Sequence, residues 1–283
     1  MLTLEVTSAE RAAGALTEAR LQAAMTALRE DGCLALEGVV KPAHLATIGE
    51  RMQADLPAIL AREDAPYNFN RGNVQQMPPP FPPYLFADVV ANDLIVSITE
   101  AVLGPGVQNG FYSGNTALPG EFRQPVHVDS GQLWPGLTVA PPAYGMVVNL
   151  PVVDMSPENG AVELWPGTHR DTALSLAAES IVVPEAAQRR YRESAAPLQP
   201  TLACGGALIR DLRLWHRGMP NWTATARPML AMIHYVRWWR AGRLTFPRGT
   251  EAIFAHPRLR TAADFVEGPV EYLGHGRAYD YAG

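Results

Sequence analysis

The chain has only two cysteines, Cys33 and Cys204, among its 283 residues. Two thiols cannot form the disulfide framework of a secreted protein, so the composition indicates a reducing compartment. The N-terminus lacks a basic segment followed by an apolar run, so no signal peptide is expected. No apolar stretch reaches the roughly 18 residues that a membrane span requires. We therefore expect a cytoplasmic protein that has no membrane partner.

The sequence also lacks an excess of positive charge. Its 23 Lys and Arg residues and 28 Asp and Glu residues give a formal net charge of −5. Proteins that bind nucleic acids usually carry a basic face, so no nucleic-acid partner is expected. Apolar residues make up 47% of the chain, which is enough for a sizeable core. Because no repeat or shift in composition marks a boundary, one domain is predicted over residues 1–283.

The N-terminal part of the sequence, mainly residues 15–105, has the apolar spacing of helices. Leu21, Met25 and Leu28 recur every three or four residues. Pro42 stands where a helix can begin, because the first residue of a helix needs no N–H donor. These patterns predict helices at residues 17–30, 42–60 and 88–103, with one strand at residues 33–40.

Residues 67–84 interrupt this helical part of the sequence. The segment is rich in Asn and Gln at first and then contains five prolines between Met77 and Tyr84. Proline excludes a helix and a central strand. A long irregular loop of this kind is either a functional lid or an ordinary surface connection, and the sequence leaves both open. Arg71 is a candidate substrate contact within it.

From residue 107 to about 240 the sequence consists of short apolar runs separated by Gly and Pro. Such runs are typical of antiparallel strands in a sandwich or barrel. Strands are predicted at residues 110–117, 126–129, 145–153, 161–165, 207–211 and 229–239, with a solvated helical insertion within residues 177–200. Helices followed by strands favour an α+β fold, mainly β, whose N-terminal helices pack on one sheet.

The residue pattern with the most chemical content is His127-x-Asp129 together with the distant His216. Alternate residues of a strand lie on the same face, so His127 and Asp129 can hold one metal ion from one side. A second histidine arriving from another strand completes a 2-His-1-carboxylate set with open positions, which is diagnostic of non-haem Fe(II) oxygenases. Iron is therefore the expected metal, with His127, Asp129 and His216 as the catalytic centre.

Arg227 follows His216 at a distance that allows one strand to end and the next to return beside the metal. The planar guanidinium binds a carboxylate in two places and stays charged, which suits a dicarboxylate cosubstrate. Two alternatives stay open. A cupin-like metalloenzyme that uses its metal as a Lewis acid would need the triad but not Arg227. A non-catalytic jelly-roll ligand-binding protein would need neither intact.

These residues, in this order and spacing, resemble the phytanoyl-CoA dioxygenase family of Fe(II)/2-oxoglutarate dioxygenases. Pro119-Gly120 and Gln124 precede His127 as in the family. Residues 158–161 read ENGA and residues 166–170 read PGTHR, which is similar to the family signature ENGA…PGSHR with Thr168 in place of Ser. The likeness covers roughly residues 31–239.

The resemblance implies a double-stranded β-helix (jelly roll), mainly residues 107–240, under an N-terminal helical layer. It also implies 2-oxoglutarate and O2 as cosubstrates, with Arg227 on the far carboxylate and Thr168 and Asn115 as further cofactor contacts. Oxidation of an unactivated C–H bond would accompany release of succinate and CO2. Asp129 occupies the position that is Gly or Ala in related halogenases, so hydroxylation is expected; desaturation, epimerisation and ring formation stay open.

Four residues are candidates for contacting the substrate: Arg71, Tyr112, Trp134 and Trp238. Trp134 follows Asp129 in a loop that should leave the mouth of the metal site. Trp238 and Trp239 are adjacent in a strand, so only one of them can face the cavity. A free small molecule, such as a natural-product intermediate, is the expected substrate. The sequence leaves its identity and the oligomeric state open.

Overall fold

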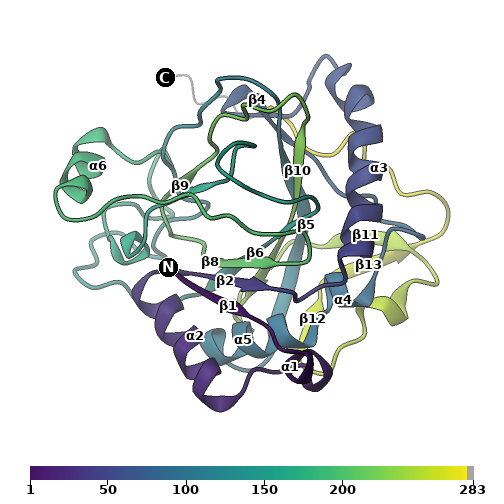
Figure 1. Ribbon diagram of the computed structural model, residues 1–283, viewed down its shortest axis with the longest axis horizontal. Coiled ribbons are helices and arrows are strands. Elements are labelled where there is room, and N and C mark those ends of the chain that lie inside the picture. Colours follow the sequence, from purple (N-terminus) through teal and green to yellow (C-terminus); the bar gives the residue numbers. More distant parts are fainter. Residues whose placement is uncertain (279–283) are drawn as a thin grey trace.

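The computed structural model describes residues 1–278, which are built around one large, twisted sheet (Figure 1). Eight strands follow the order β1-β2-β8-β6-β10-β5-β4-β3, and β12 pairs with the start of β5. The strands are Leu2–Glu5 (β1), Cys33–Glu37 (β2), Tyr67–Asn68 (β3), Asn70–Gln75 (β4), Val107–Ala117 (β5), Gly145–Pro151 (β6), Ala207–Asp211 (β8), Arg227–Tyr235 (β10) and Leu259–Thr261 (β12).

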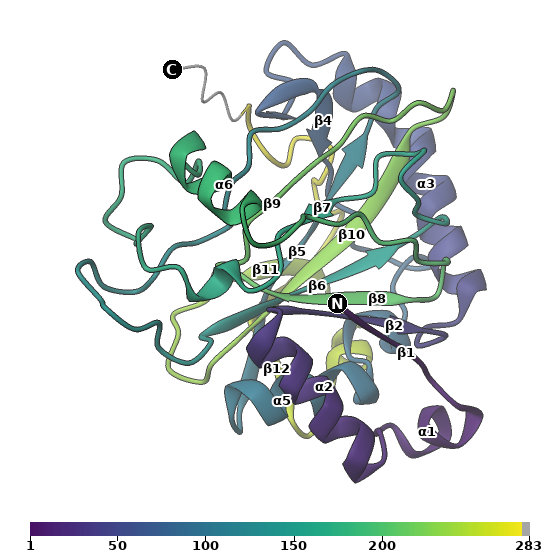
Figure 2. The same ribbon diagram turned by 60° about the vertical axis from the view of Figure 1, so that its left-hand side comes forward.

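Helices cover one face of this sheet, with α2 and α5 side by side beneath it (Figure 2). The helices are Ser8–Ala13 (α1), Glu18–Glu30 (α2), Pro42–Leu60 (α3), Ala87–Val90 (α4) and Asp93–Leu103 (α5). The side chain of Asn92 caps α5, because its oxygen accepts hydrogen bonds from the N–H groups of Leu94 and Ile95, each at 3.1 Å. Within residues 1–278, no helix is both long and apolar enough to cross a membrane.

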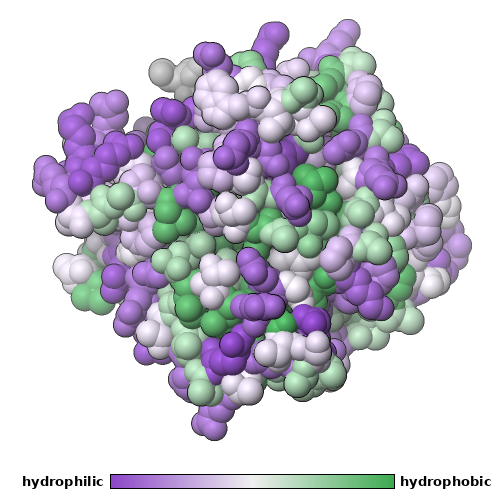
Figure 3. Space-filling model, viewed as in Figure 1, coloured by the Kyte–Doolittle hydropathy of each residue, from purple (hydrophilic) through white to green (hydrophobic). Residues whose placement is uncertain are grey.

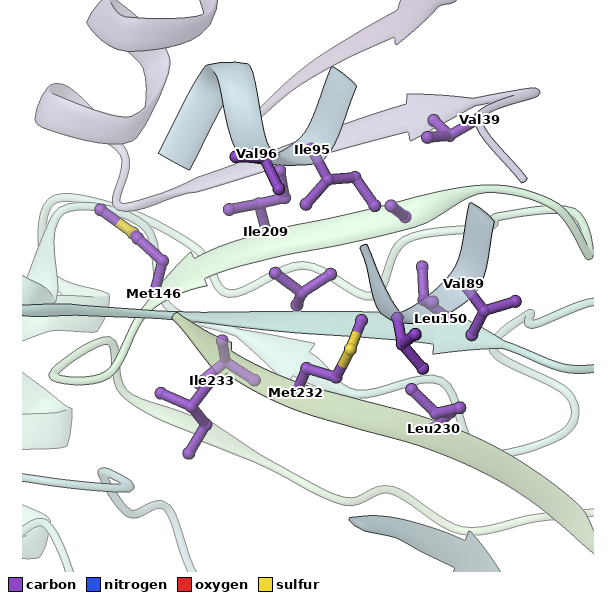
Figure 4. Close-up of a cluster of buried hydrophobic side chains, with 14 of the residues drawn as sticks. Val39, Val89, Ile95, Val96, Met146, Leu150, Ile209, Leu230, Met232 and Ile233 are labelled. Carbon is purple, nitrogen blue, oxygen red and sulfur yellow. The ribbon is translucent and has the colours of Figure 1, made fainter. Parts of the chain in front are cut away.

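The main core lies between these helices and the sheet (Figure 4). Ile95 and Val96 of α5 lie against Ile209 of β8, and Val89 of α4 lies near Leu150 of β6. Each aliphatic side chain fully removed from water contributes roughly 1.5–3 kcal/mol to stability. The packing therefore fixes the sheet from one side and leaves its other face for the second layer.

The second layer is short and irregular. Its regular part is the antiparallel pair β7 (Glu163–Leu164) and β9 (His216–Arg217). Isolated bridges extend it, and one of them pairs His127 with His216. The main sheet and this layer form the jelly roll expected from the resemblance, with helices on one face of the main sheet as predicted.

Several local predictions differ from the structure. Residues 70–75 were expected in an irregular loop but form β4, because the prolines begin only at residue 78 and leave the N–H groups of β4 free to pair with β5. Residues 126–129 do not form a regular strand, since only His127 makes ladder contacts there. The helix expected over residues 88–103 is divided into α4 and α5 at the cap Asn92.

The ends of the described chain contribute strands that were not predicted. At the N-terminus β1 pairs in parallel with β2. Beyond residue 240 a small parallel pair forms from β11 (Leu244–Pro247) and β13 (Ala263–Val266). The predicted insertion does contain a helix, α6 (Glu185–Arg192), and the hydrophilic group at the left of Figure 3 overlies it. Its charged side chains face solvent, as expected.

Candidate active site

His127 and His216 face each other across paired backbone. The N–H of each donates to the carbonyl of the other at 2.9 Å, and their ring centroids are 4.3 Å apart. The Nδ1 atom of His127 lies 2.9 Å from the carbonyl oxygen of Pro125, and that of His216 lies 2.9 Å from the carbonyl of Leu214. A carbonyl can only accept, so each Nδ1 carries the proton and each Nε2 keeps a lone pair for a metal.

Asp129 supplies the third donor. Its Oδ1 atom lies 3.5 Å from Nε2 of His216. The candidate ligand atoms of His127, Asp129 and His216 all lie within 4.8 Å of one another, and no other such group of His, Cys, Asp or Glu occurs within residues 1–278. Two nitrogens and one carboxylate converging from one side match the facial triad of non-haem iron sites.

The charges at the triad suit metal binding. Burial lowers the pKa of His127 to about 3, and the neighbouring His216 acts in the same direction, so the imidazole is neutral at neutral pH. Loss of water around Asp129 acts to raise the pKa of its carboxyl, but Arg210 and the two histidines outweigh this and hold it well below its usual range. His127 therefore presents a neutral imidazole and Asp129 a carboxylate, the forms in which these groups bind a metal.

Arg210 is a buried cation at this site that the sequence analysis did not identify. It lies on β8 and is 5% exposed, and its Nη1 atom is 2.7 Å from Oδ2 of Asp129. Its Nε donates to Oδ1 of Asn149 at 3.2 Å. The available signal was an arginine directly after the apolar run of residues 207–209, since an arginine buried with such a run needs an anionic partner.

Arg227 lies at the start of β10 and is 4% exposed. Its Nε donates to the carbonyl of Asn159 at 3.2 Å, and Nη2 donates to the carbonyl of Gly160. Its Nη1 atom is buried without a hydrogen-bond partner among the residues that the structure describes. Burial lowers the pKa of Arg227 to about 10, so it remains charged at neutral pH. An anionic ligand would satisfy this orphaned donor.

A cavity of about 350 Å³ joins the triad to Arg210 and Arg227. Alternate residues of β10 line it from one end to the other: Arg227, Met229, Ala231, Ile233 and Tyr235. Asn115 of β5 pairs with Met229 and lies at the Arg227 end. At the other end Trp239 stacks on Tyr235, with ring centroids 5.6 Å apart, and lies 5.1 Å from the ring of Tyr144. The cavity is thus polar at one end and aromatic at the other.

The segment between residues 67 and 75 supplies part of the cavity wall, including Asn68, Phe69, Asn73 and Gln75. Phe69 has a φ of 67°, a left-handed conformation that costs a non-glycine residue of order 1–3 kcal/mol. Its ring lies 4.4 Å from the ring of His127. The strained residue is therefore held against a candidate metal ligand.

The two predicted polar cofactor contacts lie in different places. Asn115 lines the cavity, and its Nδ2 donates to Oδ1 of Asn73 at 3.3 Å. The hydroxyl of Thr168 makes hydrogen bonds to backbone groups. It donates to the carbonyl of Trp165 at 2.7 Å and accepts from the N–H of Trp215 at 3.0 Å. Thr168 therefore fixes the turn that precedes His216 and does not line the cavity.

The four predicted substrate contacts lie outside the cavity wall. Trp134 and Trp238 are 57% and 66% exposed, and Arg71 is also exposed on β4. Tyr112 is buried on the helix-covered face of β5, where it packs against Phe246. Of the adjacent tryptophans, Trp239 faces the cavity. Both tryptophans lie beyond Tyr235, where β10 ends, so the strand predicted through residue 239 stops earlier and its alternation does not apply to them; the one that lines the cavity is not the one predicted.

Comparisons with known proteins give a family match and two dioxygenase relatives. The family model described as phytanoyl-CoA dioxygenase (PhyH) matches residues 28–229. The multifunctional dioxygenase ausE of Emericella nidulans is 29% identical over 164 residues, which cover 53% of each chain. The multifunctional dioxygenase prhA of Penicillium brasilianum is 27% identical over 158 residues, which cover 50% of each chain. The chain thus aligns with about half the length of these relatives.

Solved structures share the fold. AviO1 from Streptomyces viridochromogenes Tue57 superposes with a TM-score of 0.58 at 19% identity, over 78% of this chain and 97% of that one. The epimerase SnoN, solved in complex with Fe3+, alpha ketoglutarate and nogalamycin RO, superposes with a TM-score of 0.57 at 15% identity, over 92% of this chain and 98% of that one.

Proposed function

This chain belongs to the phytanoyl-CoA dioxygenase family of Fe(II)/2-oxoglutarate-dependent dioxygenases, and from this premise we propose that it hydroxylates an unactivated C–H bond of a small organic molecule. Succinate and CO2 would be released in each turnover. The observation that carries the proposal is the meeting of a 2-His-1-carboxylate set and an orphaned buried arginine in one cavity. A metalloenzyme that needs only a Lewis acid has no use for Arg227.

The residues present fit both expected cofactors. The Nε2 atoms of His127 and His216 and one oxygen of Asp129 would hold Fe(II). Nη1 of Arg227 would donate to the far carboxylate of 2-oxoglutarate, and Asn115 would add a polar contact at the same end. With O2, these groups supply the oxidising power, and the chain supplies binding, orientation and exclusion of water.

The aromatic end of the cavity defines the part of the substrate that enters it. Tyr144, Tyr235 and Trp239 form its walls, and burial raises the pKa of each tyrosine to about 12, so both phenols are neutral. The acidic and basic wall residues among the described residues are Asp129, Arg210 and Arg227, and each cation already has an anionic partner, observed or proposed. We infer an uncharged substrate portion with a flat or cyclic apolar face, which suits a natural-product intermediate.

The proposal is tested by anaerobic titration of the protein with Fe(II) and 2-oxoglutarate. We expect a weak visible charge-transfer band of the iron chelate, and admission of O2 should then convert 2-oxoglutarate to succinate. Absence of the band, together with tight binding of Zn(II) or Mn(II), would instead support a Lewis-acid metalloenzyme.

Replacement of Trp239 by leucine is expected to weaken binding of uncharged ring compounds by about tenfold, because an aromatic wall contributes contact area and ring stacking. The matched control is Trp134→Leu, which changes an exposed tryptophan outside the cavity wall and should leave binding unchanged. The measurement is the shift of the charge-transfer band when each of two probes is titrated into the protein. The probes are methyl naphthoate, which is uncharged, and naphthoate, which is its anionic counterpart. Equal effects of the two substitutions, or preference for the anion, would contradict the assignment of the aromatic end.

A further inference from the structure

The two oxygens of Asp129 have different partners. Oδ2 lies 2.7 Å from Nη1 of Arg210, whereas Oδ1 lies 3.5 Å from Nε2 of His216 and faces the point where the three candidate ligands converge. The side chain of Asp129 is 31% exposed, toward the cavity. Arg210 therefore acts on the oxygen that is not needed as a metal ligand.

We propose that Arg210 is a positioning residue that restricts Asp129 to binding the metal through one oxygen. The inference rests on the proposed function, because it concerns iron held by this triad. A carboxylate can bind a metal through one oxygen or through both. An ion pair to Arg210 engages one oxygen and leaves the other for the metal.

The number of ligands shows why this restriction matters. A bound iron of octahedral geometry, held by two imidazoles, one carboxylate oxygen and both donor atoms of 2-oxoglutarate, would have one position left. If both oxygens of Asp129 were ligands, that position would be filled. By engaging Oδ2, Arg210 would keep it free.

The surroundings of Arg210 hold it in place for this role. It extends from β8, which pairs on its two sides with β2 and β6. Asn149 of β6 accepts a hydrogen bond from its Nε, and the side chain is almost fully buried. A buried guanidinium keeps its carboxylate partner because the unpaired charge would cost several kcal/mol. The pair is therefore a fixed part of the site.

Nitric oxide is a suitable probe, because it binds ferrous iron only at an open position and gives a nitrosyl EPR signal. We would compare its affinity for the anaerobic Fe(II)·2-oxoglutarate form of the wild type, Arg210→Met, Arg210→Gln and Arg210→Lys. Loss of an outer partner of a metal ligand typically costs 10–100-fold, so we expect Met and Gln to weaken nitric oxide binding at least about tenfold. Lys, which can still pair with Asp129, should restore much of it.

The control is Arg51→Met, which removes an arginine from a different carboxylate pair, with Asp55, outside the cavity. It should leave nitric oxide affinity unchanged. Arg210→Gln provides a second variant if the apolar methionine prevents folding. If Arg210→Met and Arg210→Gln both bind nitric oxide with wild-type affinity and give a normal nitrosyl signal, the role proposed for Arg210 is overturned and the iron site is not. A wild type without any nitrosyl signal would overturn the iron site itself.

Discussion

Replacement of His216 by alanine is expected to abolish iron binding at the triad. The backbone hydrogen bonds between His216 and His127 do not involve the side chain, so the pairing of the second layer should survive. The variant loses one of three donors, and we expect the Fe(II) affinity to fall by more than the 10–100-fold typical of outer partners. The charge-transfer band with 2-oxoglutarate should disappear, as measured by anaerobic absorption titration.

The control for this substitution is His44→Ala. His44 lies on the helix-covered side of the molecule, where it pairs with Asp88, and takes no part in the cavity. Its removal should leave the band intact. A band of wild-type strength in the His216 variant would mean that the metal binds elsewhere, and the assignment of the triad would then fail.

Arg227→Ala is expected to raise the 2-oxoglutarate requirement by about 100-fold while leaving Fe(II) binding close to the wild-type value. The substitution removes the buried cation whose Nη1 has no partner within residues 1–278, and loss of one member of a buried charge pair costs roughly 2–5 kcal/mol of binding. The two quantities are measured separately, by Fe(II) titration without 2-oxoglutarate and by 2-oxoglutarate titration at saturating Fe(II).

The variant Arg227→Lys keeps the positive charge at this position but removes the planar guanidinium. Arg227 also donates to the carbonyls of Asn159 and Gly160, and a lysine cannot reproduce the planar fork that serves these contacts and a carboxylate together. We expect partial recovery of 2-oxoglutarate binding and a lower melting temperature for both variants. An unchanged 2-oxoglutarate requirement in Arg227→Ala would contradict the role of Arg227, whatever the stability of the variant.

Two of the three candidate metal ligands could be predicted from local spacing. His127 and Asp129 are separated by one residue in an extended segment, and that spacing alone places both side chains on one side. Arg227 could be predicted because it begins the strand that returns after His216. The apolar spacing of α2 and α3 likewise indicated buried helix faces without knowledge of their partners.

Other features depend on contacts between distant segments, which local patterns do not encode. The choice between Trp238 and Trp239 is set by where β10 ends and the chain turns, and a shift of one residue reverses it. The role of Arg210 depends on its ion pair with Asp129, which is far away in the sequence. The Thr168 hydroxyl accepts a hydrogen bond from the backbone N–H of Trp215. The motif that contains Thr168 could be recognised in the sequence, but this contact could not.

The two faces of strand β10 should tolerate mutation differently. Its alternate residues from Arg227 to Tyr235 line the cavity, whereas residues between them, such as Leu230 and His234, lie on the helix-covered face. His234, for example, is bonded to Thr99 of α5 at 2.9 Å. Mutations at Ala231, which lines the cavity and belongs to no core cluster of the described residues, can therefore reshape the set of molecules that fit the cavity while the fold is kept. Substitutions that broaden the range of substrates should therefore occur at the cavity-facing positions of β10. Substitutions that cause misfolding should occur at the positions on its helix-covered face.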